Sequence, residues 1–302
     1  MENAEVVQAS SLRISTKVIT ADYGSPIDRG VLFQHIHKVL IPLWYPGEGV
    51  LKMEHEKQII GCSSKDAFSK RKISEKTFFN QSTFVLRKAV NPEKTKFKEV
   101  NCKIFGNGGV QMTGIPTEEF GQEVLQWLLD ILKTIDAPIF QATPGLYKFR
   151  VKLINSDFTV AHPIRRDILH NILTRSYGLF STFEGTIYQG VNTKYYYNDQ
   201  NLRKEDKPGI CMCMKKCRGQ GSGSGPGECK KITMAIFQTG KIIITGARFM
   251  YQIEEAYQFL LNVLHKHAYD VLRIPDPAQK VPDVPQKAKR ASRRKKGLLK
   301  IA

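Results

Sequence analysis

The chain has 302 residues, 41% of them hydrophobic and 10% aromatic, so it is long enough to bury one large core or two ordinary ones. Its 46 Lys and Arg against 28 Asp and Glu give a net charge of +18, which indicates a polyanionic partner, with nucleic acid ahead of a membrane surface. No apolar run approaches the ~20 residues of a membrane-spanning helix, the N-terminus lacks a signal-peptide pattern, and six cysteines are too few for a disulfide scaffold, so we expect an intracellular protein.

The first half of the chain alternates between strand and helix patterns. After a short tail (1–11), the alternation of 12–22 predicts a strand, and Ser25 followed by Pro26 is typical of a helix start. The stretch 41–75 is rich in Pro, Gly and polar residues, and we interpret it as an irregular surface insertion. Three strands and a helix capped by Thr117 complete this half, at 76–90, 97–105, 110–113 and 117 to about 135.

The second half repeats this order after a linker at 137–147. A strand at 148–160 precedes a helix that His162 and Pro163 open. Residues 198–229 are interpreted as a second insertion, rich in Cys and Gly, and 269–302 as a Pro-rich linker followed by a basic tail without the apolar residues that a fold requires. Further strands and the last helix are predicted near 186–197, 230–237, 241–245 and 250–267.

Two segments are closely alike. Residues 104–114 read IFGNGGVQMTG and residues 236–246 read IFQTGKIIITG, and Ile-Phe, the following Gly and Thr-Gly all recur at an offset of 132. A fixed offset shared by two long segments indicates a tandem duplication, while the alternative is two unrelated Gly-flanked hairpins. Because the flanking patterns repeat as well, we favour duplication, with a first repeat at 12–136 and a second repeat at 148–268.

This pattern predicts an α+β fold in which two repeats form one curved antiparallel sheet with the helices on its convex face. Each helix has one apolar stripe to bury, so the helices cover one sheet face and leave the other uncovered. An uncovered face that mixes apolar and basic residues marks an interaction surface. The residues predicted to point there are apolar (Phe105, Phe237, Val18, Ile243), small and polar (Thr113, Thr245, Thr16, Asn155) or basic (Lys103, Arg87, Lys194).

With these motifs in place, the sequence resembles the TATA-box-binding protein family. IFQTGKIIITGAR at 236–248 is close to that family's hairpin motif, 104–114 is a looser match, and 163–165 and 180–184 are similar to its second repeat. The Cys- and Gly-rich insertion and the basic tail resemble the diverged versions carried by large DNA viruses. The resemblance implies a monomeric saddle that lies on the DNA minor groove, inserts Phe side chains into base steps and bends the duplex.

The resemblance also assigns the inserting side chains by position. The inner Phe of each repeat falls on Phe105 and Phe237. The outer Phe of the second repeat falls on Tyr188, and that of the first repeat falls on Gln81. Phe79, two residues before Gln81, takes that role instead if the strand contains a bulge.

The centre and the rim are assigned in the same way. The family's central Thr pair falls on Thr113 and Thr245, its paired Asn positions fall on Thr16 and Leu153, with Asn155 one strand-step further, and its backbone-contacting Arg positions fall on Arg87 and Lys194. Lys103, Gln111 and Thr16 make the first repeat more polar than the family's pattern. Whether the preference is for a TATA element therefore stays open, while general minor-groove bending is compatible with these departures. The minor groove mainly distinguishes A·T from G·C, so the chemistry supports a preference for A/T-rich DNA and no finer one.

Four cysteines gather in the second insertion: Cys211, Cys213, Cys217 and Cys229. Four thiolates are a ligand set that Zn²⁺ takes in structural sites, so one reading is a structural zinc ion that holds the insertion. The spacing lacks the usual Cys-x₂-Cys pair, and the other reading is four unpaired thiols in a loop. The sequence alone leaves both interpretations open.

The sequence contains no clustered carboxylates, nucleophile–base pair or nucleotide-binding loop, so we expect a protein that is not an enzyme. The resemblance implies a general transcription initiation factor whose partners are double-stranded DNA, a TFIIB-like factor and RNA polymerase, located in the nucleus or a viral replication compartment, or packaged in the virion. The alternatives are an architectural DNA-bending protein with little promoter specificity and a nucleic-acid-processing enzyme on the same fold.

Overall fold

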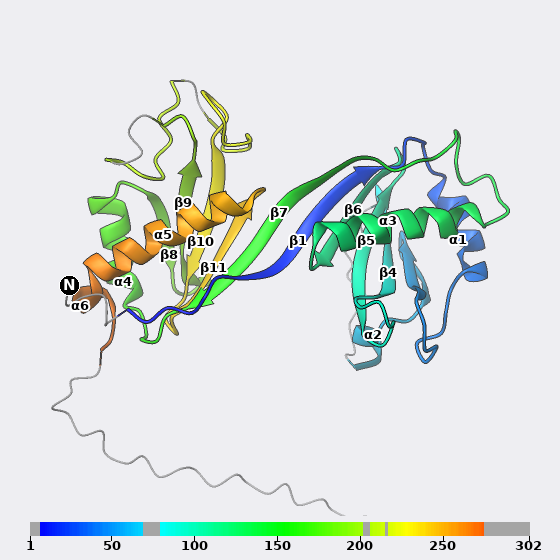
Figure 1. The fold of residues 1–302 in the computed structure, drawn as a ribbon, viewed down its shortest axis with the longest axis horizontal. Coiled ribbons are helices and arrows are strands. Elements are labelled where there is room, and N and C mark those ends of the chain that lie inside the picture. The colour runs from blue at the N-terminus through cyan, green and yellow to red at the C-terminus, as the bar shows by residue number, and fades with distance from the viewer. Residues whose placement is uncertain (1–6, 69–78, 202–205, 215–216, 275–302) are drawn as a thin grey trace, which may run out of the picture.

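The computed structural model describes residues 7–68, 79–201, 206–214 and 217–274. Within them the chain forms one open, curved antiparallel sheet with helices on one face (Figure 1). The sheet order is β3-β2-β4-β5-β6-β1-β7-β11-β10-β9-β8. Each repeat therefore forms one half of the sheet, and the halves meet where β1 (Arg13–Asp22) pairs with β7 (Tyr147–Thr159).

The two repeats share a strand–helix–four-strand–helix order, to which the first repeat adds β3 and α2. The first repeat continues after β1 with α1 (Arg29–His35), the 3₁₀ turn η2 (Ile36–Lys38), β2 (Gly49–His55), β3 (Gln58–Gly61), α2 (Ser64–Phe68), β4 (Gln81–Ala89), β5 (Phe97–Phe105), β6 (Gly109–Ile115) and α3 (Glu118–Lys133). The second repeat continues after β7 with α4 (Arg166–Asn171), the π-helical turn η3 (Ile172–Ser176), β8 (Phe180–Glu184), β9 (Tyr188–Tyr197), β10 (Lys230–Ile236), β11 (Lys241–Ala247), α5 (Met250–Lys266) and α6 (Ala268–Val271).

The core has two parts, one under each long helix. Figure 1 shows α3 and α5 lying across the same face of the two halves. The apolar stripe of α3 packs on β1, β4, β5 and β6, and that of α5 packs on β7, β9, β10 and β11. The α+β fold with helices on one face is thus confirmed, and the opposite face, here called the uncovered face, carries the alternate strand residues.

Three local expectations were wrong. Residues 41–75 are not an irregular insertion, because β2 enters the sheet beside β4 and brings β3 with it. The Pro- and Gly-rich residues before Gly49 obscured the apolar run that forms this strand. The strand β8 was missed because it is only five residues long. Finally, the first helix is capped by Asp28, whose carboxylate accepts from the Val31 N–H. Ser25, the expected cap, is buried and its hydroxyl accepts from the Ala142 N–H.

The described part of the N-terminal tail lies against the second repeat. Ala9 forms a bridge with Val160, and Val7 is buried in the core under α5. The basic residues at 287–302 lie outside the described residues, as does most of the linker before them.

Candidate nucleic-acid interface

The two inner phenylalanines lie on the uncovered face. Ile104 and Ile236 are fully buried under the helices, and strand alternation turns the next residues, Phe105 and Phe237, to the opposite side. Both rings are half-buried and belong to neither core cluster. The prediction that these side chains face away from the helices is confirmed.

A tight glycine turn fixes the backbone after each ring. Gly108 and Gly240 have φ values of +88° and +84°, which residues with a side chain rarely adopt. A Cβ atom would lie 2.3 Å from the Ser25 carbonyl oxygen at Gly108, and 2.4 Å from the Val160 carbonyl oxygen at Gly240. Each hairpin is therefore packed against the chain that leaves the first strand of its repeat, which holds the ring at a rigid end of the sheet.

The outer aromatic positions follow from strand register. In β4–β5, Ile104 pairs with Ser82, and in β9–β10 its repeat counterpart Ile236 pairs with Val191. Counting outward from these pairs, the counterpart of Tyr188 is Phe79. Phe79 and Tyr188 are 62% and 42% exposed, so both rings are accessible.

Gln81, assigned to the outer position by alignment, instead pairs directly with Phe105. The matching position in the second repeat is Gly190, where a Cβ would lie 2.8 Å from Tyr188 and 3.2 Å from Phe237. The absence of a side chain there allows these two rings to meet edge to face with 5.8 Å between centroids.

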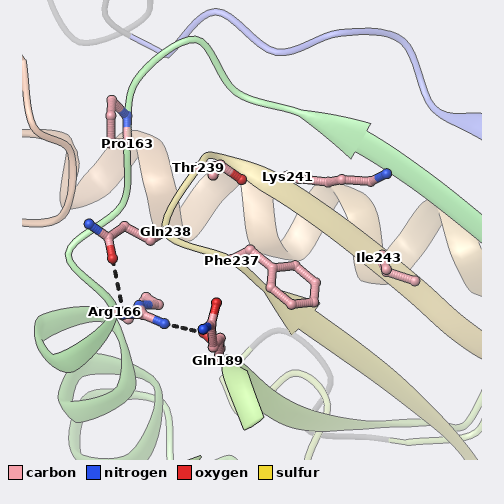
Figure 2. A pocket seen from close by; sticks show the side chains of 8 residues that line it. All are labelled: Pro163, Arg166, Gln189, Phe237, Gln238, Thr239, Lys241 and Ile243. Atoms are coloured by element: carbon pink, nitrogen blue, oxygen red, sulfur yellow. Dashed lines mark hydrogen bonds between the residues drawn. The ribbon is translucent and has the colours of Figure 1, made fainter. Parts of the chain in front are cut away.

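A hollow of about 590 Å³ opens beside Phe237 (Figure 2). Arg166 of α4 spans its floor, donating to the Gln238 side-chain oxygen at 3.0 Å and to the Gln189 carbonyl oxygen. Lys241 also lines this hollow and adds a second positive charge to it. Arg166, Gln189 and Lys241 were not among the residues predicted from the sequence, although the Lys that follows the hairpin Gly is a visible signal. The full lining is Pro163, Arg166, Gln189, Phe237, Gln238, Thr239, Lys241 and Ile243.

At the centre of the sheet, two rows of paired side chains cross β1 and β7. One row continues onto β11 of the second repeat, and the other continues onto β6 of the first repeat. Thr16 pairs with Asn155, which pairs in turn with Thr245 and accepts a hydrogen bond from its hydroxyl. On the other side, Leu153 pairs with Val18, and Val18 pairs with Thr113. The two rows occupy equivalent positions, yet the row toward the second repeat is polar throughout and the row toward the first is largely apolar.

The predicted basic contacts are less alike than the alignment implied. Arg87 directs its guanidinium to the loop at 43–47. It donates at 2.9 Å to the carbonyl oxygens of Gly47 and Leu43 and also to that of Tyr45. Lys194 donates to the Thr233 hydroxyl at 3.0 Å. By register the counterpart of Lys194 is Val85, so Arg87 and Lys194 are not an equivalent pair.

Partial burial lowers the pKa of Lys194, and the nearby Lys231 adds to this effect. The two ammonium groups therefore lie close enough to repel each other on the uncovered face of the second repeat. In the first repeat, Lys103 and Gln111 pair directly across β5 and β6 and make that half polar, as expected.

Polar contacts tie the extra segment of the first repeat to the sheet. The Ser64 N–H and hydroxyl of α2 both donate to the Glu99 carboxylate. Lys52 donates to Asp66 at 3.0 Å and also pairs with Glu54 at 2.6 Å. These contacts occupy the Lys52 ammonium and the carboxylates of Glu99 and Asp66.

The contacts of Asp66 with Ser63 and Lys52 favour its ionised form. Burial tends to raise the pKa of its carboxyl, but hydrogen bonds from Ser63 and the neighbouring Lys52 ammonium outweigh burial and lower the pKa to about 2. The carboxylate is thus ionised and engaged at neutral pH.

The four insertion cysteines converge, with their sulfur atoms all within 4.8 Å of one another. They lie at the end of β9 and β10, away from the aromatic pairs. None of the helices among the described residues is long and apolar enough to cross a membrane.

Known proteins are similar to this chain. Residues 190–267 match the family model described as transcription factor TFIID, or TATA-binding protein. A TATA-box-binding protein-like protein of Acanthamoeba polyphaga mimivirus is 31% identical over 218 residues, which are 68% of this chain and 53% of the relative, so the chain spans about half the length of that relative. The solved structure of Methanococcus jannaschii TBP matches with 15% identity and a TM-score of 0.42, covering 85% of this chain and 99% of that chain. Together, the family match to the second repeat, the mimivirus relative and the duplicated hairpins place this chain in the TATA-box-binding protein family.

Proposed function

We propose that this chain is a DNA-binding general transcription initiation factor that lays its uncovered face on the minor groove of A/T-rich DNA and bends it. The observation that carries the proposal is the pair of aromatic side chains at each end of that face: Phe79 with Phe105, and Tyr188 with Phe237. Rings at two ends of one surface suit insertion at two base steps of one duplex, and the unstacking they cost is offset by the larger contact with bent DNA.

The centre of the face suits the minor groove between those steps. Its side chains are short, so a duplex can approach the sheet closely, and A·T pairs offer only acceptors there, to which Thr and Asn groups can donate. The polar row formed by Thr16, Asn155 and Thr245 lies on one side, and the apolar row lies on the other. A face with this asymmetry distinguishes the two ends of a site, so we infer that binding has a preferred orientation.

Charge supports the same proposal. The net charge of +18 favours phosphate binding through counterion release. Lys194, Lys231 and Lys241 all lie in the second repeat. We therefore propose that the second repeat makes the stronger phosphate contacts.

By family membership we further propose that the bent complex recruits a TFIIB-like factor and RNA polymerase through the flank and helices of a DNA-bound monomer, in the nucleus or a viral replication compartment. The alternative is an architectural protein that bends DNA with little promoter specificity, which the polar departures Lys103 and Gln111 favour. An enzymatic role has less support. The carboxylates of Glu99 and Asp157 lie in different repeats, and each is engaged, by Ser64 and by Arg13 respectively.

Selection of binding sites from random duplex DNA tests the proposal, with the bend of each winning duplex read by energy transfer between dyes at its ends. We expect short A/T-rich winners, a preferred orientation and a strong bend. Winners without a shared sequence but with a strong bend would favour the architectural alternative. Unbent winners would contradict both.

A further inference from the structure

The strongest feature outside the uncovered face is the cysteine cluster of the second insertion. Cys211 and Cys213 lie in one arm of the insertion, Cys217 follows, and Cys229 directly precedes β10. The Cys229 sulfur lies 3.4 Å from that of Cys213 and 3.6 Å from that of Cys211. All four ligand atoms fall within 4.8 Å of one another, although 18 residues separate the first cysteine from the last.

These separations fit a shared metal ion better than disulfides. A disulfide bond holds its sulfurs at roughly 2.05 Å, well below the distances here. Four sulfurs at about 2.3 Å from one tetrahedral zinc ion lie roughly 3.8 Å apart, close to the distances observed. A set of four thiolates is a closed structural site, with no position left for a substrate.

Hydrogen bonds donated to the cysteine sulfurs also fit metal-bound thiolates. The Gly227 N–H donates to the Cys213 sulfur at 3.1 Å, and the Asn198 side-chain amide donates to the Cys229 sulfur at 3.5 Å. Metal-bound thiolates are acceptors that such N–H groups stabilise and orient. Asn198 is itself buried, and its amide also donates to the Gly225 carbonyl oxygen at 2.7 Å, so the donor is held in place.

The cluster lies where the insertion joins the sheet. The Gly221 N–H donates to the Cys229 carbonyl oxygen, and the Gly219 carbonyl accepts from the Lys231 N–H of β10. Gln252 of α5, fully buried, donates to the Ser222 carbonyl oxygen at 2.6 Å. An ion bound here would thus tie the insertion to both a central strand and the long helix of the second repeat.

We propose that Cys211, Cys213, Cys217 and Cys229 bind one zinc ion as thiolates, and that this ion fixes the insertion to β10 and α5. On binding, each thiol forms a sulfur–metal bond and releases its proton to solvent. The four sulfurs supply a complete ligand set by themselves, so metal binding here does not depend on how the protein binds DNA.

Metal analysis of the full chain, purified without oxygen, tests the proposal. We expect one zinc per chain in the wild type and in the control variant Cys62→Ser, whose cysteine is exposed and outside the cluster. The double variant Cys211→Ser with Cys229→Ser should lose the zinc. Absence of stoichiometric metal in the wild type, iron in place of zinc, or full zinc occupancy in the double variant would overturn the proposal.

A second measurement on the wild type holds even where the double variant fails to fold. Stepwise chelation should release zinc, expose all four cluster thiols to alkylation and accelerate proteolytic cleavage within 206–229, while DNA binding by the uncovered face persists. Cys62 should react before and after chelation alike. Disulfide-linked peptides from the untreated protein, or cluster thiols that react fully before chelation, would show that no metal is bound.

Discussion

Replacing Phe237 with Ala should separate the binding role of this ring from a role in the core. The ring lies on the uncovered face, half-buried, and its main aromatic neighbour is Tyr188 at 5.8 Å between centroids. An aromatic pair of this kind contributes about 1 kcal/mol beyond area burial, and burial of half the ring contributes about 1 kcal/mol more, so the free energy of unfolding should fall by about 2 kcal/mol. Removing a fully buried ring such as Phe158, which is 1% exposed, should cost ~3–5 kcal/mol.

The same substitution should also weaken the binding of DNA. Stacking of an aromatic side chain on a base contributes about 1–3 kcal/mol, so losing the ring should cost about 2 kcal/mol of binding free energy. Because 1.4 kcal/mol corresponds to a factor of ten, the affinity should fall roughly 30-fold. The bend of the duplex should also decrease, since one of its two kinks loses the inserted side chain.

Denaturant unfolding and energy transfer on an end-labelled duplex measure the two effects on the same protein. Phe158→Ala is the matched control, since it removes the same atoms from the core of the same repeat and should leave the bend unchanged wherever the protein is folded. If Phe237→Ala instead loses 3–5 kcal/mol of stability and keeps the full bend, the ring supports the fold and the proposed mechanism fails.

Three further predictions concern other parts of the molecule. Phe79→Ala should reduce bending at the first-repeat end more than Gln81→Ala does, as energy transfer on the selected duplex can measure; the reverse order would show that the register argument misplaces the outer ring. Asp66→Asn should destabilise the protein by about 1–2 kcal/mol at pH 7, because the lowered pKa stabilises the fold above the unfolded pKa near 3.8. That cost should shrink as the pH falls from about 4 toward 2, and a pH-independent cost in denaturant titrations would contradict the assignment. Deleting 287–302 should flatten the salt dependence of DNA affinity without changing the bend, because eight cations of that segment would no longer release counterions, so an unchanged salt slope would count against a phosphate-binding role.

Much of the fold could be predicted from the sequence because its signals are local. The apolar stripes of 118–133 and 250–266 determine which side of each helix is buried. Strand alternation then places Ile104 and Ile236 inside, with their Phe neighbours outside. The duplicated hairpin also required no structure, because a shared offset of 132 is visible in the letters alone. The residues of the candidate face could therefore be predicted from the periodicity of apolar residues, which repeats every 3.6 residues in a helix and every two in a strand.

What the sequence could not decide depends on pairing between distant strands. Gln81 and Phe79 are two residues apart, and only the register of β4 against β5 shows which one corresponds to Tyr188. The resemblance assigned Arg87 to contact with the DNA backbone, yet the loop at 43–47 accepts its hydrogen bonds. The convergence of Cys211 with Cys229 likewise arises from chain folding across the insertion. Spacing along the chain determines which face a residue takes, whereas tertiary contacts determine its neighbours, and the chemistry of a site depends on those neighbours.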